Sequence, residues 1–151
     1  MTRSKEKEPR ILGRRLEAAA DVARRLPEID VLYLFGSFAA GNAHRLSDID
    51  LGVLLGAHVA SEKYFDLKRK YITEFADALM TDGVDVVVLN EAPAHLAFEV
   101  IAPRNVLFER NPVRRVEFEV RAVNAFLDFR PILEARRGYV KQQLAQGEFF
   151  G

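Results

Sequence analysis

The sequence predicts an α/β domain in which helices pack on a small β-sheet. Two short runs, residues 31–35 and 84–89, are apolar and rich in β-branched or aromatic side chains, which is typical of buried strands. Apolar residues alternate with other residues from Ile49 to Leu55, which indicates a further strand. Segments with helical spacing separate these strands, and this order of elements is that of an α/β domain.

The first part of the chain is predicted to be a helix, a strand and a loop. Apolar residues recur at helical spacing over 11–26, and Pro27 ends the pattern. The following strand stops at Gly36, which predicts a turn. Residues 38–47 are expected to form a short turn of helix and a loop before the next strand begins.

The middle of the chain alternates helices and strands. Residues 60–80 have helical spacing. Residues 84–89 are apolar apart from Asp85, so we expect a buried central strand covered on both faces. A helix is predicted over 93–102, and a short edge strand over 105–109.

The last part of the chain is predicted to be helical over 112–146, where Pro131 is expected to break or kink the helix. Apolar residues line two stripes of this segment, which is more than one-sided packing needs. The helix is therefore either clamped across the sheet or an interface for a second copy or another protein. Its arginines, spaced among acids, are expected to form mostly a solvated face. We expect one domain over 1–151, with a core at about 10–110 and the helical extension after it.

Composition excludes several classes of protein. The 22 basic and 22 acidic residues give zero net charge, which argues against a generic nucleic-acid binder. The absence of cysteine excludes disulfides and thiolate metal sites. No apolar run approaches the ~20 residues that span a membrane, and the charged first ten residues do not resemble a signal peptide. We therefore expect a cytoplasmic protein without direct contact with membranes or nucleic acid.

Asp48 and Asp50 stand two residues apart at the start of a predicted strand, so their side chains share a face. Two carboxylates ~5 Å apart repel by roughly 3 kcal/mol at an effective dielectric near 20. A bound cation relieves this repulsion, and ligands that are all oxygen favour Mg²⁺ or Mn²⁺. The alternative is a pair of surface aspartates on the exposed face of an edge strand.

Gly36 and Ser37 follow directly after a predicted strand. A glycine at this point lets main-chain N–H groups approach a phosphate, and the serine hydroxyl adds a donor. A helix beginning just after them would also favour an anion at its N-terminus. The alternative is an ordinary strand-to-helix turn that Ser37 caps.

Asp85 is the third candidate carboxylate. A buried lone carboxylate is costly unless it is paired or binds a metal ion. The alternative is an aspartate near a strand end that a neighbouring main-chain group or arginine satisfies. Asp82 precedes a glycine, so it is better explained as a turn residue.

These motifs together resemble the minimal nucleotidyltransferase (MNT) family of the polymerase-β-like superfamily. The pattern is Gly36-Ser37, ten residues, Asp48-x-Asp50, and then Asp85 within an apolar strand. At residue frequencies of ~5–7%, the four fixed positions of the first two motifs arise by chance in about two of a thousand chains of this length. The motifs cover residues 29–90, and the C-terminal part is similar to MNT antitoxins that pair with HEPN-domain toxins.

The resemblance implies a small mixed sheet and a metal-dependent nucleotidyltransferase. Asp48, Asp50 and Asp85 would be the catalytic and Mg²⁺-binding (or Mn²⁺-binding) residues of a two-metal site. Gly36 and Ser37 would bind ATP, and Ser47, which we expect to shape the turn before Asp48, is grouped with them. AMP would pass from ATP to a tyrosine hydroxyl of a partner HEPN toxin, and the chain could also form a homo-oligomer.

The sequence departs from a common form of the family after Gly36-Ser37. Many relatives carry basic residues there, whereas this chain has Phe38 and Ala40. The phosphates would then depend more on main-chain donors, His44 and Arg45. Two alternatives therefore stay open: an antitoxin that acts by direct binding with little catalysis, and nucleotidyl transfer to a small molecule such as an aminoglycoside.

Overall fold

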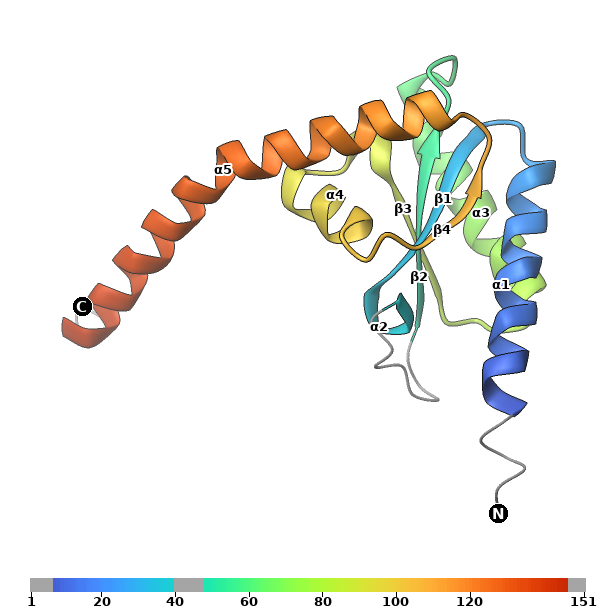
Figure 1. Ribbon diagram of the computed structural model, residues 1–151, viewed down its shortest axis with the longest axis horizontal. Helices are drawn as coiled ribbons and strands as arrows, with labels where there is room; N and C mark the ends of the chain where they lie inside the picture. The colour runs from blue at the N-terminus through green and yellow to red at the C-terminus, as the bar shows by residue number, and fades with distance from the viewer. Residues whose placement is uncertain (1–6, 40–47, 147–151) are drawn as a thin grey trace.

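A four-stranded mixed sheet forms the centre of the computed structural model, which describes residues 7–39 and 48–146 (Figure 1). The strands are β1 (Ile29–Phe35), β2 (Ile49–Leu55), β3 (Val84–Val88) and β4 (Val106–Glu109), in the order β3-β2-β1-β4. β1 runs antiparallel to β2 and β4, whereas β2 runs parallel to β3. The predicted small mixed sheet is confirmed, as is the edge position of β4.

One face of the sheet is covered by α1 (Lys7–Arg25) and α3 (Tyr64–Leu79), and a short 3-10 turn, η1 (Ser61–Lys63), leads into α3. Leu51 and Val53 of β2 pack in one core with Val22 of α1 and Phe75 of α3. Because α3 carries the chain from the end of β2 back to the start of β3, these two strands can pair in parallel.

The opposite face is covered by α4 (Ala94–Ile101) and by the first half of α5 (Pro112–Gln146), with η2 (Leu89–Glu91) leading into α4. Tyr33 of β1 packs here with Val100 and Phe118. The Tyr33 hydroxyl also donates a hydrogen bond to Glu119 at 2.9 Å. Asp50, near the start of β2, is only half-buried on this face.

β3 is an edge strand, so the prediction of a buried central strand is wrong. Within the described residues it pairs only with β2. Val84, Val86 and Val88 are buried beneath α3, whereas Asp85 is exposed. Val87 is half-buried against the second core, which is the apolar cluster between the sheet and helices α4 and α5. A strand whose two faces both meet apolar neighbours has the composition of a central strand even at the edge of a sheet.

α5 is one continuous helix that contains Pro131, so the proline does not break it. Proline removes one main-chain hydrogen bond and clashes with the preceding turn, which commonly bends a helix without ending it. Figure 1 shows α5 changing direction in its middle and leaving the body. The sequence predicted that Pro131 would break or kink the helix, and the structure shows a kink.

Arginines at the start of α5 and just before it fix the helix to the body, which corrects the prediction of a solvated face for these positions. The Arg110 guanidinium donates, at 3.1–3.3 Å, to main-chain carbonyls at the end of α1 and beyond it, those of Ala23, Arg24, Leu26 and Ile29. The carbonyls at the C-terminal end of a helix carry partial negative charge, so a cation is favourable there. Arg114 lies 3.2 Å from the Asp30 carboxylate and donates to the carbonyl of Leu55. The later arginines of α5 are exposed, as predicted.

None of the helices in the described parts of the chain combines the length and hydropathy needed to cross a membrane.

Candidate functional site

Asp50 and Asp85 lie side by side on adjacent parallel strands, because the register of β2 and β3 pairs their Cα atoms. Their neighbours Leu51 and Val86 belong to the core under α1 and α3, so both carboxylates belong to the α4 face of the sheet. The sequence alone left this register open. The structure therefore brings together two of the three predicted carboxylates.

Asp48 lies just before β2 and beside the start of β3. The main-chain N–H of Ile49 donates to the carbonyl of Gly83 at 2.7 Å. A Cβ at Gly83 would come within 2.8 Å of the Asp48 Oδ1 atom, so the absence of a side chain at Gly83 makes room for this carboxylate. All three predicted aspartates thus lie at one end of the β2–β3 pair.

The exposure of these carboxylates differs from the expectation for Asp85. Asp48 and Asp85 are exposed and Asp50 is half-buried. The argument that Asp85 is a buried carboxylate in need of a partner is therefore wrong, because β3 is at the edge of the sheet. Its claim to a role comes instead from its register with Asp50.

Negative charge gathers around Asp50. Its pKa is raised, first by burial and then by the charges of Asp85, Asp48 and Glu99. Glu99 is an exposed residue of α4 and was not predicted as part of the site. Its position on an amphipathic helix carries no signal of proximity to β2, since only the packing of α4 on the sheet brings it there. Negative charge of this kind around Asp50 favours a nearby cation.

The donor set fits a divalent cation that a nucleotide helps to bind. The described residues contain no group of three or more Asp, Glu, His or Cys side chains arranged to hold a metal ion by themselves. Mg²⁺ in phosphate-transfer sites usually takes one or two carboxylates together with substrate phosphates. Asp50 and Asp85, in register, supply such a pair, and Asp48 lies next to them.

Gly36 places the end of β1 against this cluster. Phe35 pairs with Asp50 across the sheet, and α2 (Gly36–Ala39) begins at the next residue. Gly36 has φ of +72°, and a Cβ there would overlap the Asp50 carboxylate. Only glycine combines this conformation with this close approach. The main chain of Gly36 therefore lies directly beside the predicted metal ligand.

Ser37 is the second residue of α2, so it is not the residue before the helix that the capping alternative requires. Phe38 is partly buried and packs against the core shared with α1 and α3. The position at which many relatives are basic thus anchors α2. Ala40, His44, Arg45 and Ser47 lie outside the described residues, so the structure does not place these predicted contacts.

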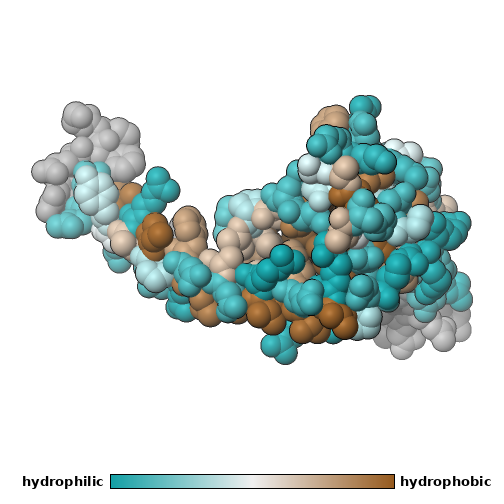
Figure 2. Space-filling model, turned by 90° about the horizontal axis from the view of Figure 1, so that it is seen from above, coloured by the Kyte–Doolittle hydropathy of each residue, from teal (hydrophilic) through white to brown (hydrophobic). Residues whose placement is uncertain are grey.

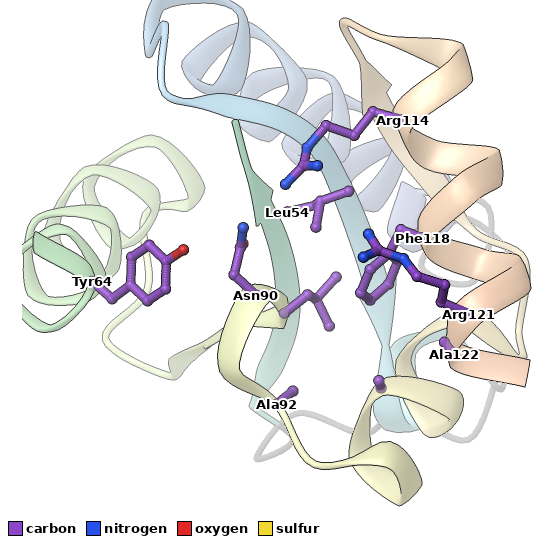
Figure 3. Close-up of a pocket in the computed structure, with 10 residues that line it drawn as sticks. Leu54, Tyr64, Asn90, Ala92, Arg114, Phe118, Arg121 and Ala122 are labelled. Carbon is purple, nitrogen blue, oxygen red and sulfur yellow. The ribbon is translucent and has the colours of Figure 1, made fainter. Parts of the chain in front are cut away.

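A cavity of about 350 Å³ opens on the same face of the sheet but at the other end of β2 (Figure 3). Leu54, Phe118, Arg114 and Arg121 are among the residues that line it. Leu54 is four residues from Asp50 along the strand, which corresponds to ~13 Å. The cavity is therefore separate from the carboxylate cluster. Arg114 is already occupied by Asp30 and Leu55.

Comparison with known proteins agrees with this geometry. The family model described as Polymerase beta, Nucleotidyltransferase matches residues 17–113, which include every carboxylate of the cluster. The protein adenylyltransferase MntA of Shewanella oneidensis is 37% identical over 76 residues, covering 50% of this chain and 51% of that protein. The chain thus spans about half the length of the curated relative it matches.

Two solved structures are similar over more of the chain. A crystal structure of a toxin-antitoxin with AMP-PNP superimposes with a TM-score of 0.61 and 26% identity, over 86% of this chain and 98% of that chain. A toxin-antitoxin MntA-HpeT mutant, in which two aspartates two positions apart are replaced by glutamate, gives a TM-score of 0.59 and 25% identity over 83% and 93%. The resemblance predicted from Gly36-Ser37 and the aspartates is confirmed, and the chain belongs to the polymerase beta nucleotidyltransferase family.

Proposed function

We propose that this chain is a metal-dependent nucleotidyltransferase that acts as an antitoxin in the cytoplasm, transferring AMP from ATP to a tyrosine hydroxyl of a HEPN-domain toxin. The observation that carries the proposal is the pairing of Asp50 with Asp85, next to Asp48 and against the main chain of Gly36. The relatives support it, because one is a protein adenylyltransferase and another is a toxin-antitoxin with AMP-PNP.

The chemistry is a displacement at the α-phosphorus of ATP. The tyrosine oxygen forms a bond to this phosphorus while the bond to the oxygen that bridges the α- and β-phosphates breaks. Pyrophosphate leaves, and the product carries AMP on the tyrosine. The hydroxyl proton passes to a carboxylate, for which Asp85 is suited because it is exposed at the edge of the sheet.

The chain's residues divide this work by position. Asp48 and Asp50 would hold the cation that accompanies the phosphates, and Asp85 would share a second cation near the acceptor. Mg²⁺, when bound, neutralises phosphate charge and lowers the pKa of the attacking hydroxyl. Gly36 and Ser37 would donate main-chain N–H groups and a hydroxyl to the leaving phosphates. Because Phe38 anchors α2 in the core, these donors keep their place without a basic side chain there.

The test is intact-mass spectrometry of the product of the neighbouring gene, which the proposal requires to be a HEPN-domain protein. After incubation with this chain, ATP and Mg²⁺, the partner should gain the mass of one or more AMP residues, and peptide mapping should locate them on tyrosine. The Asp48→Ala variant should give no gain. Omitting Mg²⁺ or adding EDTA should have the same effect.

The alternative outcomes identify other functions. A stable complex without any mass gain, and protection of cells by Asp48→Ala as good as that by the wild type, would make the chain an antitoxin that acts by contact. Absence of both complex and mass gain would refute the antitoxin proposal and direct the search to small-molecule acceptors such as aminoglycosides.

A further inference from the structure

The second half of α5 extends away from the rest of the described chain (Figure 1). We call residues Leu127–Gln146 the arm. Phe126 immediately precedes the arm. Its ring stacks on that of Phe98 of α4, with 4.0 Å between the ring centroids. Beyond it, the arm side chains whose burial the structure describes are exposed, apart from the half-buried Gln143. Figure 1 shows the arm passing beyond the end of α4.

The side of α5 that packs on the body continues as an apolar side of the arm. Val140 is 18 residues after Ala122, and Leu144 is 18 residues after Phe126, which corresponds to five turns of helix. Each distal residue therefore lies on the same side as its buried or half-buried counterpart. Val140 is 36% exposed and Leu144 is 55% exposed, whereas Ala122 is 6% exposed.

Other apolar arm side chains widen this surface. Phe129, Ile132 and Tyr139 are 38%, 59% and 61% exposed. Isolated helices of fewer than ~12–15 residues are marginal in water, and longer ones depend on packing of an apolar side. Figure 2 shows brown and tan side chains along the arm and an open hollow between the arm and the body. A further surface packed in this hollow would cover those on the edge of the arm that faces it, whereas other brown side chains lie on the opposite edge of the helix.

The base of the arm lies on the same side of the sheet as the candidate site. Phe98, whose ring stacks on Phe126, is a residue of α4, and α4 packs on β1 of the sheet. Asp50 and Asp85 also belong to the face of the sheet that α4 covers. A macromolecule held against the arm would therefore lie on the α4 side of the sheet, the side to which Asp50 and Asp85 belong.

The charge of the arm specifies the surface that it would bind. The last twelve residues of the arm carry Arg136, Arg137 and Lys141 and no acidic residue, whereas the whole chain has zero net charge. A complementary surface has apolar side chains bordered by aspartate or glutamate. We propose that the arm docks the acceptor protein through an apolar surface with an acidic border, and so presents its hydroxyl to the Asp50 cluster; this rests on the proposed function.

Binding of the proposed HEPN-domain partner, measured by isothermal titration calorimetry, tests this docking. The double variant Val140→Asp/Leu144→Asp should weaken binding by about 30-fold or more, because these side chains would be anchors of the interface. Its affinity for AMP-PNP with Mg²⁺ should stay that of the wild type, and circular dichroism should show unchanged helix content. Arg136→Glu/Arg137→Glu should weaken binding as well, and most at low salt.

The matched control is Val113→Asp/Val116→Asp, which places the same charges on exposed valines of another side of α5. This control should bind the partner like the wild type. Wild-type binding by the arm variant, or loss of binding by the control alone, would overturn the docking proposal. Absence of any binding by the wild type would overturn it together with the antitoxin function, whereas a complex without AMP transfer would contradict only the catalytic part.

Other occupants of the arm give distinct results. If a second copy covers the arm, the wild-type chain alone is a dimer in sedimentation equilibrium and the arm variant is a monomer. If a membrane covers it, the chain sediments with phosphatidylglycerol vesicles and the arm variant does not. Either result, with partner binding unaffected by the arm variant, would replace the acceptor protein as the occupant.

Discussion

The carboxylate cluster should make the metal-free protein less stable than it would be without Asp85, and the substitution Asp85→Asn isolates this effect. Neighbouring strands lie ~4.8 Å apart, so two carboxylates in register and on one face are ~5–6 Å apart. At an effective dielectric of 20 their repulsion is ~3 kcal/mol, and at that of water it is below ~1 kcal/mol. Because Asp85 is exposed and Asp50 half-buried, we take the lower part of this range, about 1 kcal/mol.

Scanning calorimetry in EDTA measures the stability that Asp85→Asn should gain from removing this repulsion. For a chain of this length, about 1 kcal/mol corresponds to a rise in Tm of about 2–4 °C. With Mg²⁺ and AMP-PNP at about 100 times Kd, the wild type should gain about 2.7 kcal/mol, while Asp85→Asn should gain much less because one cation ligand is missing. The variant should thus be the more stable protein without ligand and the less stable one with it.

Asp82→Asn is the matched control, because Asp82 is an exposed aspartate in the turn just before β3. It should change neither the Tm in EDTA nor the gain from Mg²⁺ and AMP-PNP. If Asp85→Asn lowers the Tm in EDTA, or if it gains as much from the ligands as the wild type, then Asp85 does not share a cation site with Asp50.

Three further predictions follow from particular contacts. Gly36→Ala should lower the free energy of unfolding by about 2 kcal/mol in urea titration, because alanine at this positive φ is strained and meets the Asp50 carboxylate; an unchanged midpoint would contradict the close approach. Arg110→Ala should cost about 2 kcal/mol, because four main-chain carbonyls lose their charged donor, while Arg137→Ala on the exposed arm should cost less than ~0.5 kcal/mol. The raised pKa of Asp50 means that the folded chain binds this proton more tightly than the unfolded one. Its contribution to stability is therefore complete below the unfolded pKa of ~3.9 and is lost as pH rises through the folded value; in EDTA, Asp50→Asn should remove this loss from the pH dependence of Tm.

Much of the fold was predictable because the apolar patterns report burial directly. Strands β1 and β2 were found from an apolar run and from alternation, and α3 was found from helical spacing. The place of β3 was not predictable from composition, because α3 and the second core together surround an edge strand with apolar neighbours. Order within a sheet depends on contacts between distant segments, which local periodicity does not encode.

The candidate site was predictable where its residues are close in sequence. Two-residue spacing places Asp48 and Asp50 at one strand end, and Gly36 ends the strand that pairs with it. Glu99 was missed because its relation to Asp50 exists only after α4 packs on the sheet. Arg110 was misread for the same reason, since its carbonyl partners lie more than 80 residues earlier.

Asp85 shows how a candidate residue can be chosen on an argument that the structure contradicts. The reasoning from sequence was that a carboxylate inside an apolar strand must be buried and in need of a partner. The structure exposes Asp85 at the edge of the sheet, and it is the parallel register with Asp50 that supports the role proposed for this residue. An edge position suits the proposed role better than a buried one, because the proposed acceptor protein would have to reach the carboxylate from outside. A central strand would have enclosed Asp85 between two neighbours, whereas the open edge of β3 leaves one side of the cluster accessible to a large substrate.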